Sequence, residues 1–224
     1  YLPPTRIVWQ ATTGSSSIEG IDKLLLPGNG QAELVGGKEC VIRKRPDGKV
    51  SFLLDFGREL QGGIQIVTGQ SSRKEAKVRI RFGESVSEAM CDITPENGAT
   101  NDHAIRDFHF TLPWLGVAEI GNSGFRFVRI DVEEPDIDLL LKEVRATFGY
   151  RDIPYLGSFK SDNDRLNDIW MTGAYTVHLN MQEYIWDGVK RDRLVWIGDL
   201  HPELMTVNTR SEEHTSELQS LPAI

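Results

Sequence analysis

Residues 77–82 read KVRIRF, and apolar side chains alternate with cationic ones through this stretch. Val78, Ile80 and Phe82 share one side of an extended chain, because successive side chains of a β-strand point to opposite faces. The three cationic side chains share the other side. This period of two predicts a half-buried strand, with its apolar face in a core.

Five further segments have strand character, and they are separated by stretches rich in Gly, Pro, Asn and Asp. The strand candidates are residues 51–56, 63–67, 107–112, 125–132 and 140–148. The turn candidates are residues 46–48, 62–63, 95–98 and 121–124. Many short strands with turn residues between them predict an antiparallel β-sandwich over residues 1–150.

The pattern changes near Tyr155, and a domain boundary is predicted within residues 150–158. Residues 161–164 read SDND and supply N-cap candidates. Apolar residues then recur at three- and four-residue steps, which predicts a helix with one apolar face that runs to about Asn180. Residues 187–198 lack a sustained helical pattern and are predicted to form a structured loop. A second helix is expected to open at residues 201–203, with Pro202 in its first turn.

The composition is that of an ordinary globular protein. The 224 residues are 39% hydrophobic and 26% charged, and the formal net charge is -8. Nucleic acids and anionic membranes attract clustered Lys and Arg, so neither is expected as a partner. No apolar run approaches the roughly 20 residues of a membrane helix. Compartment and oligomeric state are left open.

Neither a metal nor a cofactor is predicted. Cys40 and Cys91 are too few for a disulfide framework or a metal site, and we expect two separate buried thiols. The histidines lack the spacing of metal ligands. The pair Gly62-Gly63 is not followed by Lys and Ser or Thr, so it is not a phosphate-binding loop.

The densest group of chemically able residues is WDGVKRDRLVWIGD at residues 186–199, with three carboxylates, three cations and two indoles. One interpretation is a salt-bridged surface loop with packed tryptophans. The other is a sugar-cleaving site, since glycosidic bond cleavage needs an acid and a second carboxylate, and aromatic walls suit sugar faces. Glu203 could contact sugar, although an acid near a helix N-terminus is also favoured by the helix dipole.

This segment resembles family 78 of the glycoside hydrolases, the α-L-rhamnosidases. The resemblance implies that Asp192 is the general acid, at a position where many relatives carry Glu. It also implies that Asp187, Arg191 and Asp199 bind the sugar and that Trp196 stacks on it. Upstream, residues 53–63, 79–90 and 124–128 look like the sandwich domain of these enzymes. Residues 157–170 look like the entry to their first barrel helix.

The resemblance implies a multidomain β + α chain, in which an antiparallel β-sandwich precedes the first helices of a truncated (α/α)6 barrel at residues 151–209. The resemblance implies a bacterial enzyme whose substrate is a rhamnose-containing glycan or glycoside. It also implies that the glycosidic bond is cleaved with inversion. The general base would be a Glu later in the barrel and outside this chain. We therefore expect the chain alone to be inactive.

Two alternatives remain open, a non-catalytic carbohydrate-binding sandwich and another (α/α)6-barrel glycosidase. Residues 210–224 are excluded from the fold prediction. Residues 210–220 read RSEEHTSELQS and resemble the translation of a common sequencing-adapter oligonucleotide. We expect this tail to be non-native.

Overall fold

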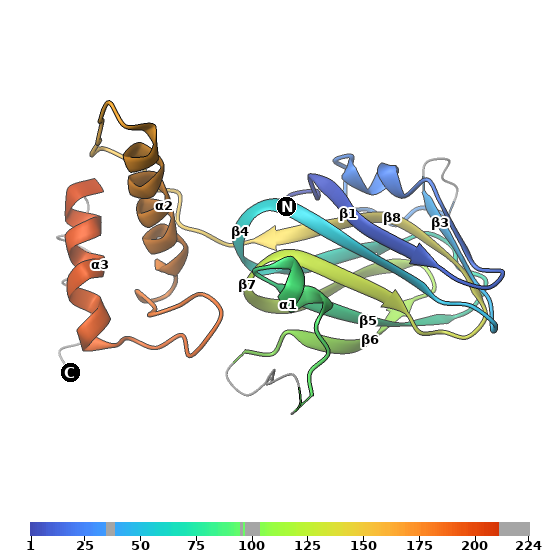
Figure 1. Ribbon diagram of the computed structural model, residues 1–224. Coiled ribbons are helices and arrows are strands. Elements are labelled where there is room, and N and C mark those ends of the chain that lie inside the picture. Colours follow the sequence, from blue (N-terminus) through green and yellow to red (C-terminus); the bar gives the residue numbers. More distant parts are fainter. Residues whose placement is uncertain (35–38, 95, 97–103, 211–224) are drawn as a thin grey trace. The chain divides into compact units, whose positions relative to one another are not determined.

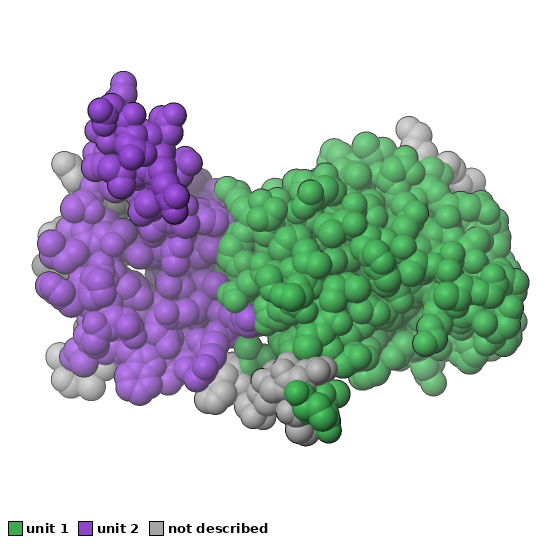
Figure 2. All heavy atoms as spheres, viewed as in Figure 1, with its two compact units in different colours: residues 1–148 green, residues 149–224 purple. Residues whose placement is uncertain are grey.

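The computed structural model describes residues 1–34, 39–94, 96 and 104–210 (Figure 1). The predicted turn at 95–98 and the predicted tail beyond residue 210 therefore lie largely outside the described residues. The chain divides into two compact units, Tyr1–Phe148 and Gly149–Ile224, which Figure 2 colours separately.

The described part of unit 1 is built from antiparallel strands with two short helices. In chain order the elements are β1 (Arg6–Thr12), β2 (Ser17–Glu19), η1 (Ile21–Leu25), β3 (Cys40–Lys44), β4 (Val50–Thr68), β5 (Glu75–Gly83), α1 (Val86–Met90), β6 (Asp107–Pro113), β7 (Gly116–Val132) and β8 (Ile137–Phe148). The strands are hydrogen-bonded in the order β2-β3-β8-β4-β7-β5-β6, and β1 pairs with β4. The predicted antiparallel β architecture is confirmed.

The long strands β4 and β7 run through both ends of this sheet. The first part of β4 pairs with β1, its last part pairs with β8, and β7 accompanies it along most of its length. The β4–β7 register shifts between Asp55 and Leu60 and again between Gly62 and Ile64. Gly57, Gly62 and Gly121 have positive φ there, at 85°, 138° and 81°. Bulges of this kind bend a strand and increase its twist.

Two sequence predictions are corrected by these strands. The candidates 51–56 and 63–67 are parts of the single strand β4, and the predicted turns at 62–63 and 121–124 lie inside β4 and β7. Gly marks both turns and bulges, because each requires backbone conformations that other residues avoid.

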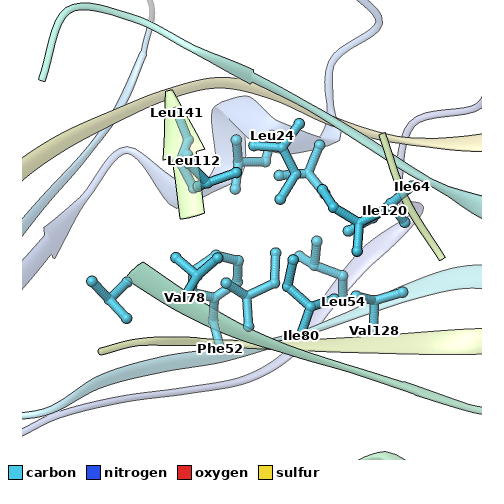
Figure 3. Packing of buried hydrophobic residues seen from close by; sticks show 14 of the residues in the cluster. Leu24, Phe52, Leu54, Ile64, Val78, Ile80, Leu112, Ile120, Val128 and Leu141 are labelled. Carbon is cyan, nitrogen blue, oxygen red and sulfur yellow. The ribbon is translucent and has the colours of Figure 1, made fainter. Parts of the chain in front are cut away.

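The core lies between two facing layers of apolar side chains. In Figure 3, one row labelled Leu24, Ile64, Leu112, Ile120 and Leu141 faces a second row labelled Phe52, Leu54, Val78, Ile80 and Val128. The Phe125 ring makes edge-to-face contacts with Phe56 and Phe82, at centroid distances of 5.6 and 5.0 Å. This packing is that of a β-sandwich.

Arg81 departs from the alternation that predicted strand β5. Its side chain is buried although it lies on the cationic face of the strand. One guanidinium nitrogen donates to Asp131 Oδ2 at 2.7 Å and another donates to Asp92 Oδ1 at 2.8 Å. Burial acts to raise the pKa of Asp131, but hydrogen bonds from Ser51, Arg81 and Arg129 outweigh it and hold this pKa below its ordinary value.

The described part of unit 2 contains the helices α2 (Asp164–Asn180) and α3 (Ile197–Arg210), which contact each other. The prediction of α2 is confirmed, including its start. Asn163 caps it, because its side-chain oxygen accepts from the Arg165 backbone N–H at 3.0 Å. Helix α3 begins at Ile197 rather than at residue 201, so Pro202 lies inside the helix and not in its first turn.

The apolar face predicted for α2 is only partly covered within unit 2. Ile169 is 58% exposed, and Leu166 is also exposed, whereas Ala174 and Leu179 are buried. Among the described residues, none of the helices has the length and apolar character required to cross a membrane.

Gly121→Ala tests the bend in β7. A Cβ at this position would lie 2.6 Å from Phe82 Cζ, and φ is +81°. We expect a loss of about 2–4 kcal/mol in the free energy of unfolding of unit 1, measured by urea denaturation. Gly116→Ala is the control, because its Cβ would meet only the Pro113 side chain at 3.2 Å and its φ is not positive. Equal stability of the two variants would contradict the proposed constraint.

Candidate functional site

The residues predicted to bind and cleave a sugar lie in the loop between α2 and α3 and in the first turn of α3. The loop begins with an isolated antiparallel bridge between Met181 and Ile185. The Trp186 N–H then donates to the Asn180 carbonyl at 3.0 Å. The segment that follows is thus fastened to the last turn of α2.

Asp187 closes the central part of this loop through two hydrogen bonds to Leu194. Its backbone N–H donates to the Leu194 carbonyl at 2.9 Å, and its Oδ1 accepts from the Leu194 N–H at 2.8 Å. One carboxylate oxygen of this predicted sugar ligand therefore holds the loop together. The other oxygen of Asp187 can accept from a ligand.

Asp192 lies near the tip of the closed segment, in an uncommon backbone conformation. Asp192 and Arg193 have φ of 63° and 55°, which is the left-handed region. The Asp192 carboxylate is 28% exposed and lies 3.4 Å from Nε of Arg191.

The two indoles of the segment differ in their surroundings. The Arg193 guanidinium lies over the Trp186 ring, 5.2 Å from its centroid. Trp196 is 53% exposed. The Trp196 carbonyl accepts from the backbone N–H groups of Asp199 and Leu200 at 3.1 and 2.9 Å and so begins α3.

Glu203 adds a buried carboxylate to this region. It follows Asp199 by four residues on α3, which places the two side chains on the same face of the helix. Glu203 is 8% exposed. Burial, and then the nearby charges of Asp199 and Asp187, raise the pKa of Glu203 to about 7.

The structure resolves the predicted site into two groups. Asp187 and Asp199 interact electrostatically with Glu203, whereas Arg191 pairs with Asp192. The sequence leaves Glu203 open to two interpretations, a sugar contact or an acid near a helix N-terminus, and in the structure it lies past the first turn of α3. The four-residue spacing from Asp199 was the available signal, but it acquires meaning only once α3 starts at Ile197.

Metal ligands and exposed aromatic side chains elsewhere in the described chain are the other candidates for a functional site. Among the described residues, no three His, Cys, Asp or Glu side chains are arranged to hold a metal ion. In the described part of unit 1 the large exposed aromatic side chains are Tyr1 and Trp114. The Arg145 guanidinium covers the Tyr1 ring at 4.1 Å.

The raised pKa of Glu203 predicts that unit 2 loses stability as pH rises. The folded state retains the proton up to about pH 7, whereas an unperturbed Glu side chain has a pKa of 4.5. The contribution of Glu203 to the free energy of unfolding of unit 2 is therefore most favourable below about pH 4.5. It falls between pH 4.5 and 7 and stays low above pH 7. Glu203→Gln removes this dependence and should be more stable than the unaltered chain at pH 8 by about 1–3 kcal/mol.

Urea unfolding followed by the helical circular dichroism signal measures this difference, because α2 and α3 are the long helices of the described chain. Glu183→Gln is the matched control, since Glu183 is exposed in the same unit. A Glu203→Gln variant that matches the unaltered chain at both pH 5 and pH 8 would show that Glu203 titrates normally.

Comparison with known proteins finds one family that matches part of unit 2. Residues 154–218 match the family described as the bacterial alpha-L-rhamnosidase 6 hairpin glycosidase domain. The matched range includes the whole loop and α3, and it ends inside the segment predicted to be a non-native tail. No curated protein matches the sequence.

Two solved structures resemble the fold over most of the chain. A rhamnosidase from Klebsiella oxytoca with rhamnose bound has a TM-score of 0.69 and 18% identity over 95% of this chain and 41% of its own. A family GH78 rhamnosidase from Bacillus sp. GL1 has a TM-score of 0.69 and 19% identity over 86% of this chain and 19% of its own.

The chain thus spans less than half the length of either solved rhamnosidase. At these identities the structural likeness is one of fold, and the family match itself lies in unit 2. The resemblance to bacterial α-L-rhamnosidases of glycoside hydrolase family 78, which the sequence indicated, is therefore confirmed.

Proposed function

We propose that this chain is part of a glycoside hydrolase that removes terminal α-L-rhamnose from glycans or glycosides with inversion at the anomeric carbon. One observation carries the proposal. The family match covers residues 154–218, and this range contains the loop in which Asp187, Asp192 and Trp196 lie.

Asp192 is the general acid in this proposal. Its carboxyl group is accessible, as an acid that protonates a leaving-group oxygen must be. The acid must also hold the proton that it donates to the leaving group. We infer that Arg191, whose side chain is 68% exposed, binds hydroxyls of the sugar.

The remaining residues hold the sugar. Asp187 and Asp199 accept hydrogen bonds from sugar hydroxyls, and hydrogen bonds to carboxylates are stronger than neutral ones. The exposed indole of Trp196 offers a flat apolar wall. Glu203, which carries a proton up to about pH 7, can donate as well as accept in this acidic group.

Inversion also requires a base that activates water on the opposite face of the sugar, with the two carboxyl groups about 6.5–9.5 Å apart. We assign this role to a residue of a complete six-hairpin domain that follows the segment described here. The exposed apolar side chains of the two helices support this assignment, because further hairpins would cover them. Ile169 on α2 is 58% exposed and Ile197 on α3 is 84% exposed.

We expect the 224-residue chain alone to release no nitrophenol from 4-nitrophenyl α-L-rhamnopyranoside. A protein that extends this chain through a complete six-hairpin domain should hydrolyse it. Proton NMR during the reaction should show the β-anomer of rhamnose as the first product, since inversion converts α to β. Cleavage of another glycoside with the rhamnoside untouched would sink the rhamnosidase assignment, and a first α-anomer would sink inversion.

Asp192→Asn in the extended protein should lower kcat by about 10²–10⁴-fold on the 4-nitrophenyl rhamnoside. The loss should be much smaller on a 2,4-dinitrophenyl rhamnoside, because this leaving group departs without a proton. Asp168→Asn is the control, since Asp168 is an exposed aspartate on α2 and lies outside the loop. Equal losses on both substrates would rule out an acid role for Asp192.

A further inference from the structure

The turn that carries Asp192 is held in the left-handed conformation, which residues other than Gly adopt uncommonly. Asp192 and Arg193 are consecutive residues with left-handed φ, at 63° and 55°. A side chain with a Cβ disfavours this region, which Gly adopts freely. Such conformations persist where the surrounding contacts enforce them, and they are concentrated at functional sites.

Arg193 supplies three of these contacts. Its backbone N–H donates to the Arg191 carbonyl at 2.8 Å, and its Nε donates to the Val189 carbonyl at 3.0 Å. Its guanidinium lies over the Trp186 ring at 5.2 Å. The Arg193 side chain therefore links Trp186 and Val189, which precede the turn, to residue 193 of the turn.

The Asp187–Leu194 pair closes the same segment from its two ends. Leu194 follows Arg193 directly, and both hydrogen bonds of the pair are 2.9 Å or shorter. The Asp187–Leu194 pair thus fixes the two ends of the segment that contains Asp192. The Arg193 side chain fixes the middle of the same segment. Rigid support of this kind sets the direction of a side chain that must meet a reacting atom.

We propose that Arg193 is a positioning residue, which keeps residues 192–193 left-handed and so fixes the direction in which the Asp192 carboxyl group projects. The inference rests on the proposed role of Asp192 as the acid. Arg193 itself acts through the Val189 carbonyl and the Trp186 ring, two contacts within the loop.

Lysine cannot reproduce both contacts. The guanidinium is planar, so Nε can donate in its plane while its face lies over an indole. The ammonium group of lysine is a point charge without such a face, and it can engage the Val189 carbonyl or the Trp186 ring but not both in this geometry. Arg193→Lys should therefore behave as a partial loss.

The first experiment uses the full 224-residue chain and measures amide hydrogen exchange by NMR. In Arg193→Met the Leu194 amide should exchange at least about tenfold faster, while the α2 amides change little. Arg193→Lys should give a smaller increase. Arg165→Met removes an exposed arginine of α2 and should leave Leu194 unchanged.

Two results would overturn the proposal. Unchanged exchange of Leu194 in both Arg193 variants would mean that the turn holds without this side chain. An equal increase at Leu194 and throughout α2 would mean that Arg193 stabilises unit 2 as a whole. If Arg193→Met fails to fold, as unit 2 signals would reveal, Arg193→Lys decides between these results.

The second experiment uses the protein extended through a complete six-hairpin domain. Arg193→Met should lower kcat by about 10–100-fold on 4-nitrophenyl α-L-rhamnopyranoside, with KM nearly unchanged. The loss should shrink on the 2,4-dinitrophenyl substrate, as expected if the acid is misdirected, and an equal loss on both substrates would contradict a positioning role. If the unaltered extended protein cleaves no rhamnoside, the proposed function fails, and hydrogen exchange still decides whether Arg193 holds the turn.

Discussion

The pairing of β4 with β7 is the constraint on which unit 1 depends. These two strands accompany each other from Ser51 and Asp131 to Thr68 and Gly116, across two shifts of register. The bends at those shifts let one hydrogen-bonded sheet present two inner faces to a shared core (Figures 1 and 3). Because β4 also pairs with β1 at one end and β8 at the other, its position fixes that of the strands around it.

In unit 2, too, hydrogen bonds fix the backbone on both sides of an uncommon conformation. The Asp187–Leu194 pair and the Arg193 side chain surround the left-handed residues 192–193. Preorganisation of this kind matters where a carboxyl group must reach a bond within a fraction of an ångström. The same carboxylate that closes the loop, Asp187, also contributes to the charge that keeps Glu203 protonated.

Local patterns in the sequence predicted the secondary-structure elements well. Features that depend on residues distant in the chain could not be predicted from it. The cap at Asn163 and the limits of α2 follow from neighbouring residues. The continuity of β7 through Gly121 does not, because a glycine that permits a bulge looks like one that ends a strand. Burial of Arg81 depends on carboxylates distant in the chain, and the left-handed turn at Asp192 has no glycine or asparagine to announce it. The proton on Glu203 likewise requires the folded loop beside α3.

A titration of the isotope-labelled 224-residue chain with L-rhamnose, followed by two-dimensional NMR, shows directly whether residues 187–199 bind the sugar. If residues 187–199 bind rhamnose, their backbone amides and the Trp196 indole N–H should show saturable shifts, with the amides of unit 1 unmoved. Shifts confined to unit 1 would mean that the sandwich binds the sugar. Such a result would contradict the assignment of residues 187–199 as the rhamnose site.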